Sequence, residues 1–259
     1  MMPLPPSTPA PFDLGTGSPT VVLFHGFTGS PYEVRPLGLA LAAGGWRAIG
    51  PVLAGHGARP EDLAAASADQ VLDGARRVLD TITGPLVLVG FSMGSLVAGL
   101  LAEEQAVRVR ALVLLSPAAR LAPWGEAGLV AVRAGLWRAL PMLPKVAKGG
   151  DCGDPEGRRR NPCYGVHPTR GLLALDQLAR RFRRAQGRVR MPTLVMHGAR
   201  DRTIPARVGA RVASALGARV VERYLLPRSR HLILLDVERD LAVAQVLDFL
   251  RRHASPEAS

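Results

Sequence analysis

A short serine motif flanked by glycines is the part of this sequence that most directly indicates chemistry. The motif Gly90-Phe91-Ser92-Met93-Gly94 follows the apolar run 85–89, which predicts a buried strand, and precedes 95–102, which predicts a helix. A G-x-S-x-G sequence between a strand and a helix forms a sharp turn that presents the serine hydroxyl above the sheet. The flanking glycines allow neighbouring backbone to approach closely. We therefore predict that Ser92 is a nucleophile.

A serine nucleophile needs a base, and the base needs a carboxylate that orients it. His231 is the candidate base, because it lies in a loop after the last predicted strand and can reach over the sheet edge. Asp201 lies in the turn after the apolar run 193–196 and is the candidate orienter. The chain order Ser92, Asp201, His231 is the one expected for this type of elbow. Asp236 is a second candidate for the orienter. Because it lies only five positions after His231, a role at the start of the next helix is favoured for it.

Backbone N–H groups near the nucleophile are needed to stabilise an oxyanion. The predicted donors are Met93, directly after the nucleophile, and Phe27, in the loop after the strand 20–24. His25 and His56 also lie in loops at predicted strand ends. Because one triad needs only one base, we predict structural roles for both histidines. The six histidines show no metal-ligand spacing, so neither a metal nor a cofactor is expected.

Apolar runs and helical spacing indicate the elements that must position these residues. Apolar runs predict buried parallel strands at 20–24, 85–89, 111–115 and 193–196. Two weaker strand candidates are 47–50 and 220–225. Helices are predicted from the spacing of apolar residues: 33–44, 69–82, 95–105, 205–216 and 238–252. Strands that alternate with helices predict the α/β class, with a doubly wound and mostly parallel sheet.

Residues 121–186 interrupt this alternation, and we predict no strand within them. A long strand-free insertion is commonly functional, so a small helical cap is favoured over helices that simply cover one sheet face. The predicted organisation has three parts. They are an extended leader (1–18), an α/β core formed by two stretches of the chain (19–120 and 187–259) and the helical cap (121–186).

Four apolar residues of the predicted cap recur at helical spacing: Leu129, Val132, Leu136 and Trp137. We predict that they line an apolar channel for the acyl chain of a substrate. The alternative is that they are core, because a leucine stripe at this spacing more often packs inside a protein.

Composition restricts the possible partners. The 259-residue chain is 47% hydrophobic and has a formal net charge of +12, almost all of it from arginine. The arginines are scattered and no nucleic-acid-binding motif accompanies them, so no nucleic-acid partner is expected. The positive field can still attract anionic substrates or lipid surfaces. No apolar run is long enough to span a bilayer, so no integral membrane association is expected.

The N-terminus lacks the basic start and apolar segment of a secretory signal, which predicts a cytoplasmic location. Cys152 and Cys163 are close enough in sequence to pair, but a reducing compartment favours two free thiols. The sequence indicates no oligomeric state.

Five segments together resemble the α/β-hydrolase superfamily, and within it the bacterial carboxylesterase and monoacylglycerol lipase branch: His25–Ser30, Gly55–Gly57, Gly90–Gly94, His197–Asp201 and Ser229–His231. The resemblance covers about residues 19–118 and 191–252. It implies an esterase for short- to medium-chain esters or monoacylglycerols. It also implies the triad Ser92, Asp201 and His231, and the oxyanion hole of Phe27 and Met93. Arg230 departs from the family pattern, which usually has a small residue before the catalytic histidine.

The predicted function is therefore a cofactor-free serine hydrolase that cleaves a small-molecule ester through an acyl-enzyme. The same fold and triad also serve thioesterases, lactonases, amidases and acyltransferases, which stay open. A non-catalytic binding module is the remaining class, but it predicts a disrupted triad or a blocked elbow, and the sequence has neither.

Overall fold

A computed structural model describes residues 3–145 and 147–256. Seven strands of this part of the chain form one sheet in the order β1-β3-β2-β4-β5-β8-β9. Neighbouring strands run parallel, except that β1 pairs antiparallel with β3 at one edge. The bounds are β1 Phe12–Leu14, β2 Thr20–Phe24, β3 Arg47–Gly50, β4 Leu86–Phe91, β5 Val109–Leu115, β8 Thr193–Gly198 and β9 Val221–Leu226.

The central strands are buried on both faces. Val22 of β2 pairs with Leu88 of β4, and both belong to the apolar cluster on one side of the sheet. Their neighbours Val21 and Val87 also pair, and belong to the cluster on the other side. Because successive side chains of a strand point to opposite faces, a doubly covered strand has a continuous apolar run. This is why these strands can be recognised in the sequence.

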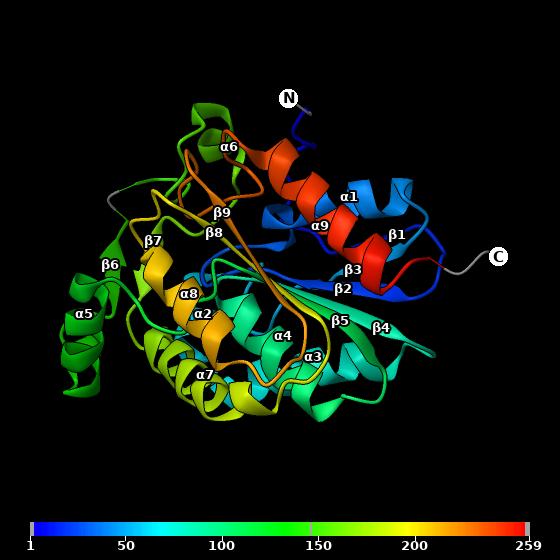
Figure 1. The fold of residues 1–259 in the computed structure, drawn as a ribbon. Coiled ribbons are helices and arrows are strands. Elements are labelled where there is room, and N and C mark those ends of the chain that lie inside the picture. The colour runs from blue at the N-terminus through cyan, green and yellow to red at the C-terminus, as the bar shows by residue number, and fades with distance from the viewer. Residues whose placement is uncertain (1–2, 146, 257–259) are drawn as a thin grey trace.

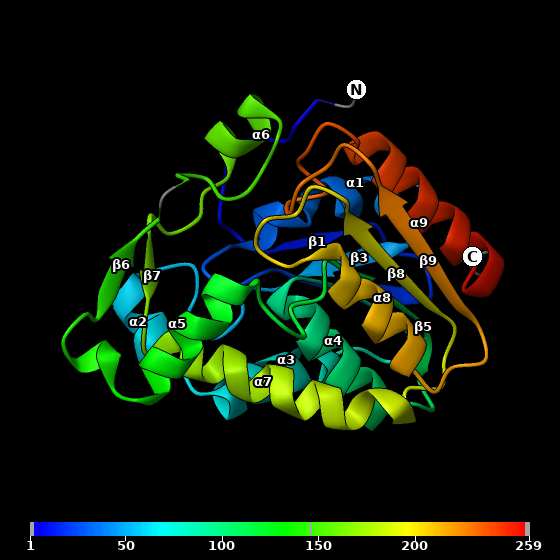
Figure 2. The same ribbon diagram turned by 60° about the vertical axis from the view of Figure 1, so that its left-hand side comes forward.

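Helices cover the two faces of the sheet (Figure 1). One face carries α1 Arg35–Ala43 and α9 Arg239–His253. The other face carries α3 Ala68–Asp80, α4 Met93–Glu104, α7 Gly171–Ala185 and α8 Ala206–Ala215. The turned view in Figure 2 shows the same two layers. The doubly wound α/β fold is confirmed, and so are the six predicted strands and the five predicted helices of the core.

The start of α3 shows how local sequence sets an element boundary. The Ser67 hydroxyl accepts a hydrogen bond from the Gln70 amide at 3.1 Å, and the Gln70 side chain accepts one from the Ser67 amide at 2.8 Å. This reciprocal capping satisfies two N–H groups that the first turn leaves without helical partners.

Residues 12–14 lie in the predicted leader and form β1 at the sheet edge. Phe12 is buried there, in the cluster that includes Leu37 and Leu41 of α1. A strand of three residues is too short to show an alternating pattern, so the sequence did not indicate it.

The segment 121–186 contains two short strands, β6 Met142–Pro144 and β7 Val166–Pro168, which pair antiparallel. The prediction of no strand in this segment was therefore wrong. Each strand has three residues and ends in proline, and both properties hide a strand from pattern recognition.

The helices of this segment divide between two places. α7 packs against α4 in the main helical layer, as the alternative prediction expected for the whole segment. In contrast, α5 Pro123–Arg133, α6 Pro155–Arg160 and the β6–β7 hairpin lie beyond the sheet at one end of the molecule (Figures 1 and 2). The short helix α2 Pro60–Ala65 lies beneath the hairpin. Three 3-10 turns complete the described elements: 31–33, 136–138 and 186–188.

Candidate active site

Ser92 occupies a strained turn between β4 and α4. Its backbone has φ 53° and ψ −114°, in a region that residues with a side chain rarely adopt. The turn is held because the Ser92 amide donates to the Leu115 carbonyl at 2.8 Å, and the Ser92 carbonyl accepts from Ala118 at 3.2 Å. Strain of this kind persists only where the surroundings fix it, and it concentrates at functional sites.

The two glycines of the motif are required by close backbone contacts. A Cβ at Gly90 would lie 2.2 Å from the Gly94 carbonyl oxygen, and one at Gly94 would lie 2.0 Å from the Phe24 carbonyl oxygen. Ser95 supports the turn from below, since its hydroxyl donates to the Gly90 carbonyl at 2.7 Å. The end of β2 and the start of α4 are consequently in direct backbone contact.

His231 lies over the sheet edge and contacts both of its predicted partners. Its Nε2 is 2.9 Å from Oγ of Ser92, and its Nδ1 is 2.7 Å from Oδ2 of Asp201. The imidazole also packs on the Phe91 ring, with 5.0 Å between the ring centroids. The structure thus brings together three side chains that are far apart in the sequence.

Asp201 is fixed by contacts at both of its carboxylate oxygens. Oδ1 accepts hydrogen bonds from the amides of Thr203 and Ile204, at 2.8 and 2.7 Å. Oδ2 faces His231 and also lies 3.1 Å from Nε2 of His197. The carboxylate therefore keeps one orientation, which in turn fixes the orientation of the His231 ring.

Asp236, the second candidate carboxylate, has a different position. It is fully buried, and its Oδ2 accepts from the amide of Arg230 at 2.6 Å. Its Oδ1 accepts from the amides of Asp154 and Val237, each at 2.8 Å. Asp236 therefore has a structural role, as predicted, but it shapes the loop that carries His231 and does not cap the helix α9, which begins at Arg239.

Burial and charge have opposite effects on these groups. Burial alone would lower the pKa of His231, but the charge of Asp201 and its hydrogen bond outweigh this and raise the pKa above the usual value. Burial alone would raise the pKa of Asp201, but His231 and His197 hold it well below the usual range. The carboxylate thus stays ionised and favours the imidazolium that forms when His231 takes a proton.

The predicted oxyanion donors lie on two backbone segments that meet at the elbow. Met93 is the first residue of α4, where helical N–H groups have no partner within the helix. Phe27 lies in the turn after β2, where the Gly29 amide donates to the Gly26 carbonyl at 3.1 Å. The turn and the helix start adjoin because Gly94 touches the end of β2.

His25 and His56 hold this turn in place. His56 Nε2 accepts from the Thr28 amide at 3.2 Å, so its Nδ1–H donates to the Ala54 carbonyl at 3.1 Å. His25 Nε2 accepts from the Leu53 amide at 3.1 Å. Burial lowers the pKa of His56 to about 4 and that of His25 well below its usual value. Both rings are neutral, which agrees with the structural roles predicted for them.

Comparison with known proteins assigns the chain to a family. Residues 17–238 match the family described as serine aminopeptidase S33. The chain belongs to this family of hydrolases. It is an enzyme of the α/β-hydrolase type, and the branch that the sequence resembled is confirmed by its relatives.

The relatives are lipases and esterases. The chain is 27% identical over 257 residues to a thermostable monoacylglycerol lipase of Bacillus sp. (strain H-257), covering 94% of this chain and 95% of that protein. It is 25% identical over 250 residues to a carboxylesterase of Bacillus subtilis (strain 168), covering 95% and 97%. The protein is therefore a serine ester hydrolase.

Solved structures share the fold. A structure from the metagenome-derived lipolytic enzymes LipS and LipT has a TM-score of 0.85 and 27% identity, covering 96% of this chain and 99% of that one. The monoacylglycerol lipase of Paleococcus ferrophilus has a TM-score of 0.82 at 19% identity, covering 95% and 99%, and shares the fold. No helix in the described part of the chain is long and apolar enough to cross a membrane.

Two residues of this hydrolase that the sequence did not single out hold the turn around Phe27. Glu33 is buried, and its Oε2 accepts from the Gly26 amide at 2.9 Å. Lys145 comes from the inserted segment, and its Nζ donates to Oγ1 of Thr28 at 2.6 Å. Burial raises the pKa of Glu33, and the nearby ammonium of Lys145 opposes that change.

Asp151 connects the inserted segment to the other two loops of the site. Its Oδ2 accepts from the amide of Arg202 at 2.8 Å, and its carbonyl accepts from the amide of Leu232 at 3.1 Å. Arg202 and Leu232 directly follow Asp201 and His231 in the chain. Only the folded chain reveals such a contact, because no motif marks it.

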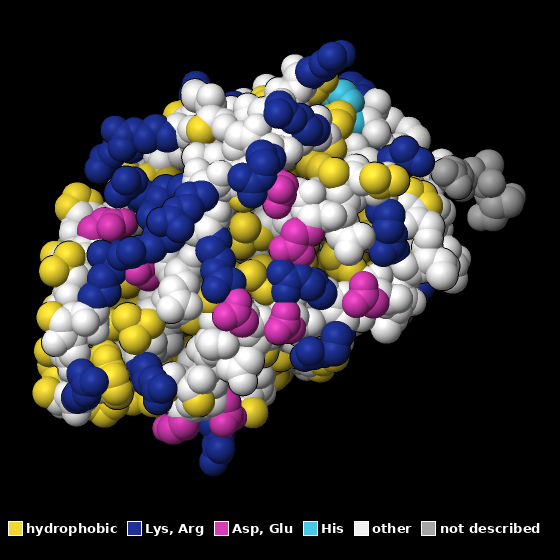
Figure 3. Space-filling model, turned by 90° about the horizontal axis from the view of Figure 1, so that it is seen from below, with side chains coloured by type: hydrophobic (Ala, Val, Ile, Leu, Met, Phe, Trp, Pro, Cys, Tyr) yellow, Lys and Arg dark blue, Asp and Glu magenta, His cyan; other side chains and the backbone are white. Residues whose placement is uncertain are grey.

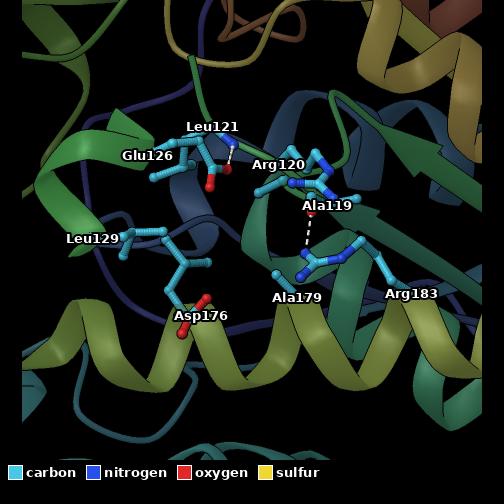
Figure 4. Close-up of a pocket in the computed structure, with 10 residues that line it drawn as sticks. Ala119, Arg120, Leu121, Glu126, Leu129, Asp176, Ala179 and Arg183 are labelled. Carbon is cyan, nitrogen blue, oxygen red and sulfur yellow. Dashed lines mark hydrogen bonds between the residues drawn. The ribbon is translucent and has the colours of Figure 1, made fainter. Parts of the chain in front are cut away.

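The four residues predicted to line an acyl channel lie on or just after α5. Leu129 and Val132 are buried, and Leu129 lies between α5 and α7 (Figure 4). Leu136 and Trp137 are half-buried in a 3-10 turn, where Trp137 lies beneath the guanidinium groups of Arg138 and Arg170. The burial of Leu129 and Val132 agrees with the alternative prediction that these residues belong to the core. A role of the four residues in an acyl channel stays a prediction.

Proposed function

We propose that this hydrolase is a carboxylesterase that cleaves short- to medium-chain esters or monoacylglycerols through a Ser92–His231–Asp201 triad. The observation that carries the proposal is the continuous chain of hydrogen bonds from Oγ of Ser92 through His231 to Asp201, at 2.9 and 2.7 Å. It supplies the nucleophile, base and orienter that serine acyl transfer requires.

In the first half-reaction, His231 Nε2 takes the proton of Ser92 as Oγ attacks the ester carbonyl carbon. Asp201 stabilises the resulting imidazolium through the bond at Nδ1. The backbone N–H groups of Phe27 and Met93 donate to the oxyanion of the tetrahedral intermediate. When this intermediate collapses, the C–O bond to the alcohol breaks and His231 returns the proton to the departing alkoxide.

The second half-reaction uses the same groups with water. His231 removes a proton from water as the water oxygen attacks the acyl-enzyme carbonyl. The second tetrahedral intermediate releases the carboxylic acid, and the proton on His231 returns to Oγ of Ser92. One ester and one water give one acid and one alcohol, and the enzyme is restored without a cofactor.

The choice of substrate rests on the relatives and on the inserted segment. A monoacylglycerol lipase and a carboxylesterase each match more than nine-tenths of the chain, which supports an ester with one acyl chain. The predicted acyl-channel residues Leu136 and Trp137 lie in the insertion, at the surface beyond the sheet. Thioesters, lactones, amides and acyl transfer to an alcohol are the alternatives for the same triad.

Activity should be measured on a panel of p-nitrophenyl esters of increasing chain length, monoacylglycerols, a thioester, a lactone and an amino-acid p-nitroanilide. We expect hydrolysis of esters or monoacylglycerols to exceed that of every other class. Preference for another class would overturn the substrate proposal and leave the triad standing.

The Ser92→Ala variant tests the nucleophile and provides the blank for the panel. We expect kcat to fall by several orders of magnitude and covalent labelling by a fluorophosphonate to disappear. Ser214→Ala is the control, because Ser214 is an exposed serine of α8 whose hydroxyl donates to backbone outside the nucleophile turn. Near-normal turnover by folded Ser92→Ala enzyme would exclude the proposed mechanism.

A cytoplasmic location remains a proposal. Cys152 and Cys163 are both free thiols, which is typical of proteins from reducing compartments. Fractionation of cells that produce the full chain would test the location.

A further inference from the structure

An open cleft between α5 and α7 concentrates positive charge. It has a volume of about 360 Å³. Its lining consists of five arginines and one glutamate: Arg120, Glu126, Arg133, Arg180, Arg183 and Arg184. Seen from below, the face that carries α7 shows Lys and Arg side chains gathered towards the α5 side (Figure 3).

The local sequence of α7 places three of these cations on one side of the helix. Arg180, Arg183 and Arg184 are spaced i, i+3 and i+4, so their side chains are neighbours on the helix surface. Like charges at this spacing destabilise a helix. A bound anion would remove this repulsion.

The carboxylates nearby neutralise only part of this charge. Asp176 forms ion pairs with Arg133 at 2.5 Å and with Arg180 at 3.1 Å. Glu126 accepts from the Leu121 amide at 2.8 Å. Within the described residues, the remaining three arginines of the cleft form no ion pair with a carboxylate: Arg120, Arg183 and Arg184.

Arg183 is held in position at the inner wall of the cleft. Its guanidinium donates to the Ala119 carbonyl, and Arg120 lies opposite it (Figure 4). Burial and the positive charge of Arg120 lower the pKa of Arg183, and the carboxylates of Glu126 and Asp176 only partly oppose this. The cleft adjoins a cavity of about 10 Å³ that shares Arg120, Glu126 and Arg183 as lining residues.

We propose that this cleft binds an anion that carries at least two phosphate groups or a comparably charged phosphate headgroup. A guanidinium group presents paired N–H donors that fit two phosphate oxygens, and three guanidinium groups without carboxylate partners line this cleft. Pockets for small ligands typically have about 300–1,000 Å³, so a small organic phosphate fits. The charged lining excludes an apolar acyl chain, which separates this site from the proposed esterase site.

Binding of inorganic pyrophosphate is the direct test, measured by titration calorimetry at about 0.15 M salt. The test variant is the double substitution Arg120→Gln with Arg184→Gln. Both residues are exposed, so their replacement leaves the core intact. The matched control is Arg207→Gln with Arg211→Gln, two exposed arginines of α8 that remove the same charge elsewhere.

We expect pyrophosphate to bind the wild-type protein and the α8 control equally, and the cleft variant to lose about tenfold or more in affinity. A second arm uses vesicles that contain cardiolipin, whose headgroup carries two phosphates, with phosphatidylcholine vesicles as the neutral reference. Binding to cardiolipin alone, with the same dependence on Arg120 and Arg184, identifies a lipid headgroup as the ligand. Equal loss in both double variants, or no binding in either arm, overturns the proposal.

Discussion

Nζ of Lys145 lies 2.6 Å from Oγ1 of Thr28, which joins the inserted segment to the turn that follows β2. The Thr28 carbonyl also accepts from the Tyr164 amide at 2.9 Å. Thr28 has φ 62°, so the turn adopts a left-handed conformation that needs outside support. The insertion therefore does more than cover the sheet, because it helps to hold the backbone that carries Phe27.

Lys145→Met should lower kcat/KM for ester hydrolysis by about tenfold, since a hydrogen bond from a charged group contributes about 1.5–3 kcal/mol. The loss should appear mainly in kcat, because the turn carries Phe27, the proposed oxyanion donor, and not a proposed contact with the bound ester. Lys148→Met is the control, as it removes an exposed lysine from the same segment. Steady-state kinetics of the two variants make the comparison. Equal rates in both would show that Thr28 needs no support from Lys145.

Asp201→Asn should reduce kcat by roughly 10⁴ while the protein stays folded, because an amide cannot hold His231 in the required tautomer. The amide oxygen still accepts from Thr203 and Ile204, so the loop keeps its contacts. Asp236→Asn should instead lower the melting temperature, because Asp236 is buried and accepts three backbone hydrogen bonds. The reverse pattern, with activity lost in Asp236→Asn, would assign the orienting role to Asp236.

The acid limb of the kcat/KM profile should lie above the ordinary histidine pKa of 6.5. His231 must be neutral to act as a base, and Asp201 raises its pKa, so activity should rise with pH through a midpoint above 6.5. In Asp201→Asn, burial acts without the opposing charge, and the midpoint should move to lower pH. Rates between about pH 5 and 9 measure both midpoints. A wild-type midpoint at or below 6.5 would contradict the charge coupling.

Gly94→Ala should destabilise the protein by about 1–3 kcal/mol or more, because overpacking forces the backbone to move. The added methyl would lie 2.0 Å from the Phe24 carbonyl oxygen and 2.7 Å from that of His25. Gly128→Ala is the matched control within α5, since apart from its chain neighbours and the backbone of its own helix no atom lies within 4 Å of the added methyl. That change should stabilise the protein by about 0.5–1 kcal/mol through helix propensity. Urea unfolding of both variants measures the difference.

The three side chains that the structure brings into contact could be picked out from the sequence. Ser92 stands in a motif whose glycines have a steric purpose, and Asp201 follows the buried apolar strand β8, whereas His231 follows the half-exposed edge strand β9. The central strands and their helices were recognised for the same reason, because burial on both faces leaves a long apolar signal. These predictions depend on patterns that extend over neighbouring residues.

Other parts of the site depend on contacts between distant segments. Lys145 and Thr28 are 117 positions apart, and nothing near either residue indicates the other. His197 belongs to a motif that the sequence did single out, but its contact with Asp201 appears only when the loop after β8 folds back. Strands such as β1 and β6, each of three residues, give too short a pattern to recognise.

The glycine at position 94 has a consequence for how this enzyme can diversify. At Gly94 the backbone of the nucleophile turn contacts the backbone at the end of β2. A shift of this turn would therefore move the loop after β2 directly, with no side chain between them. The nucleophile turn and the loop after β2 are therefore expected to move together. We expect substrate preference to change more readily in residues 121–186, where sequence can vary while this junction stays as it is.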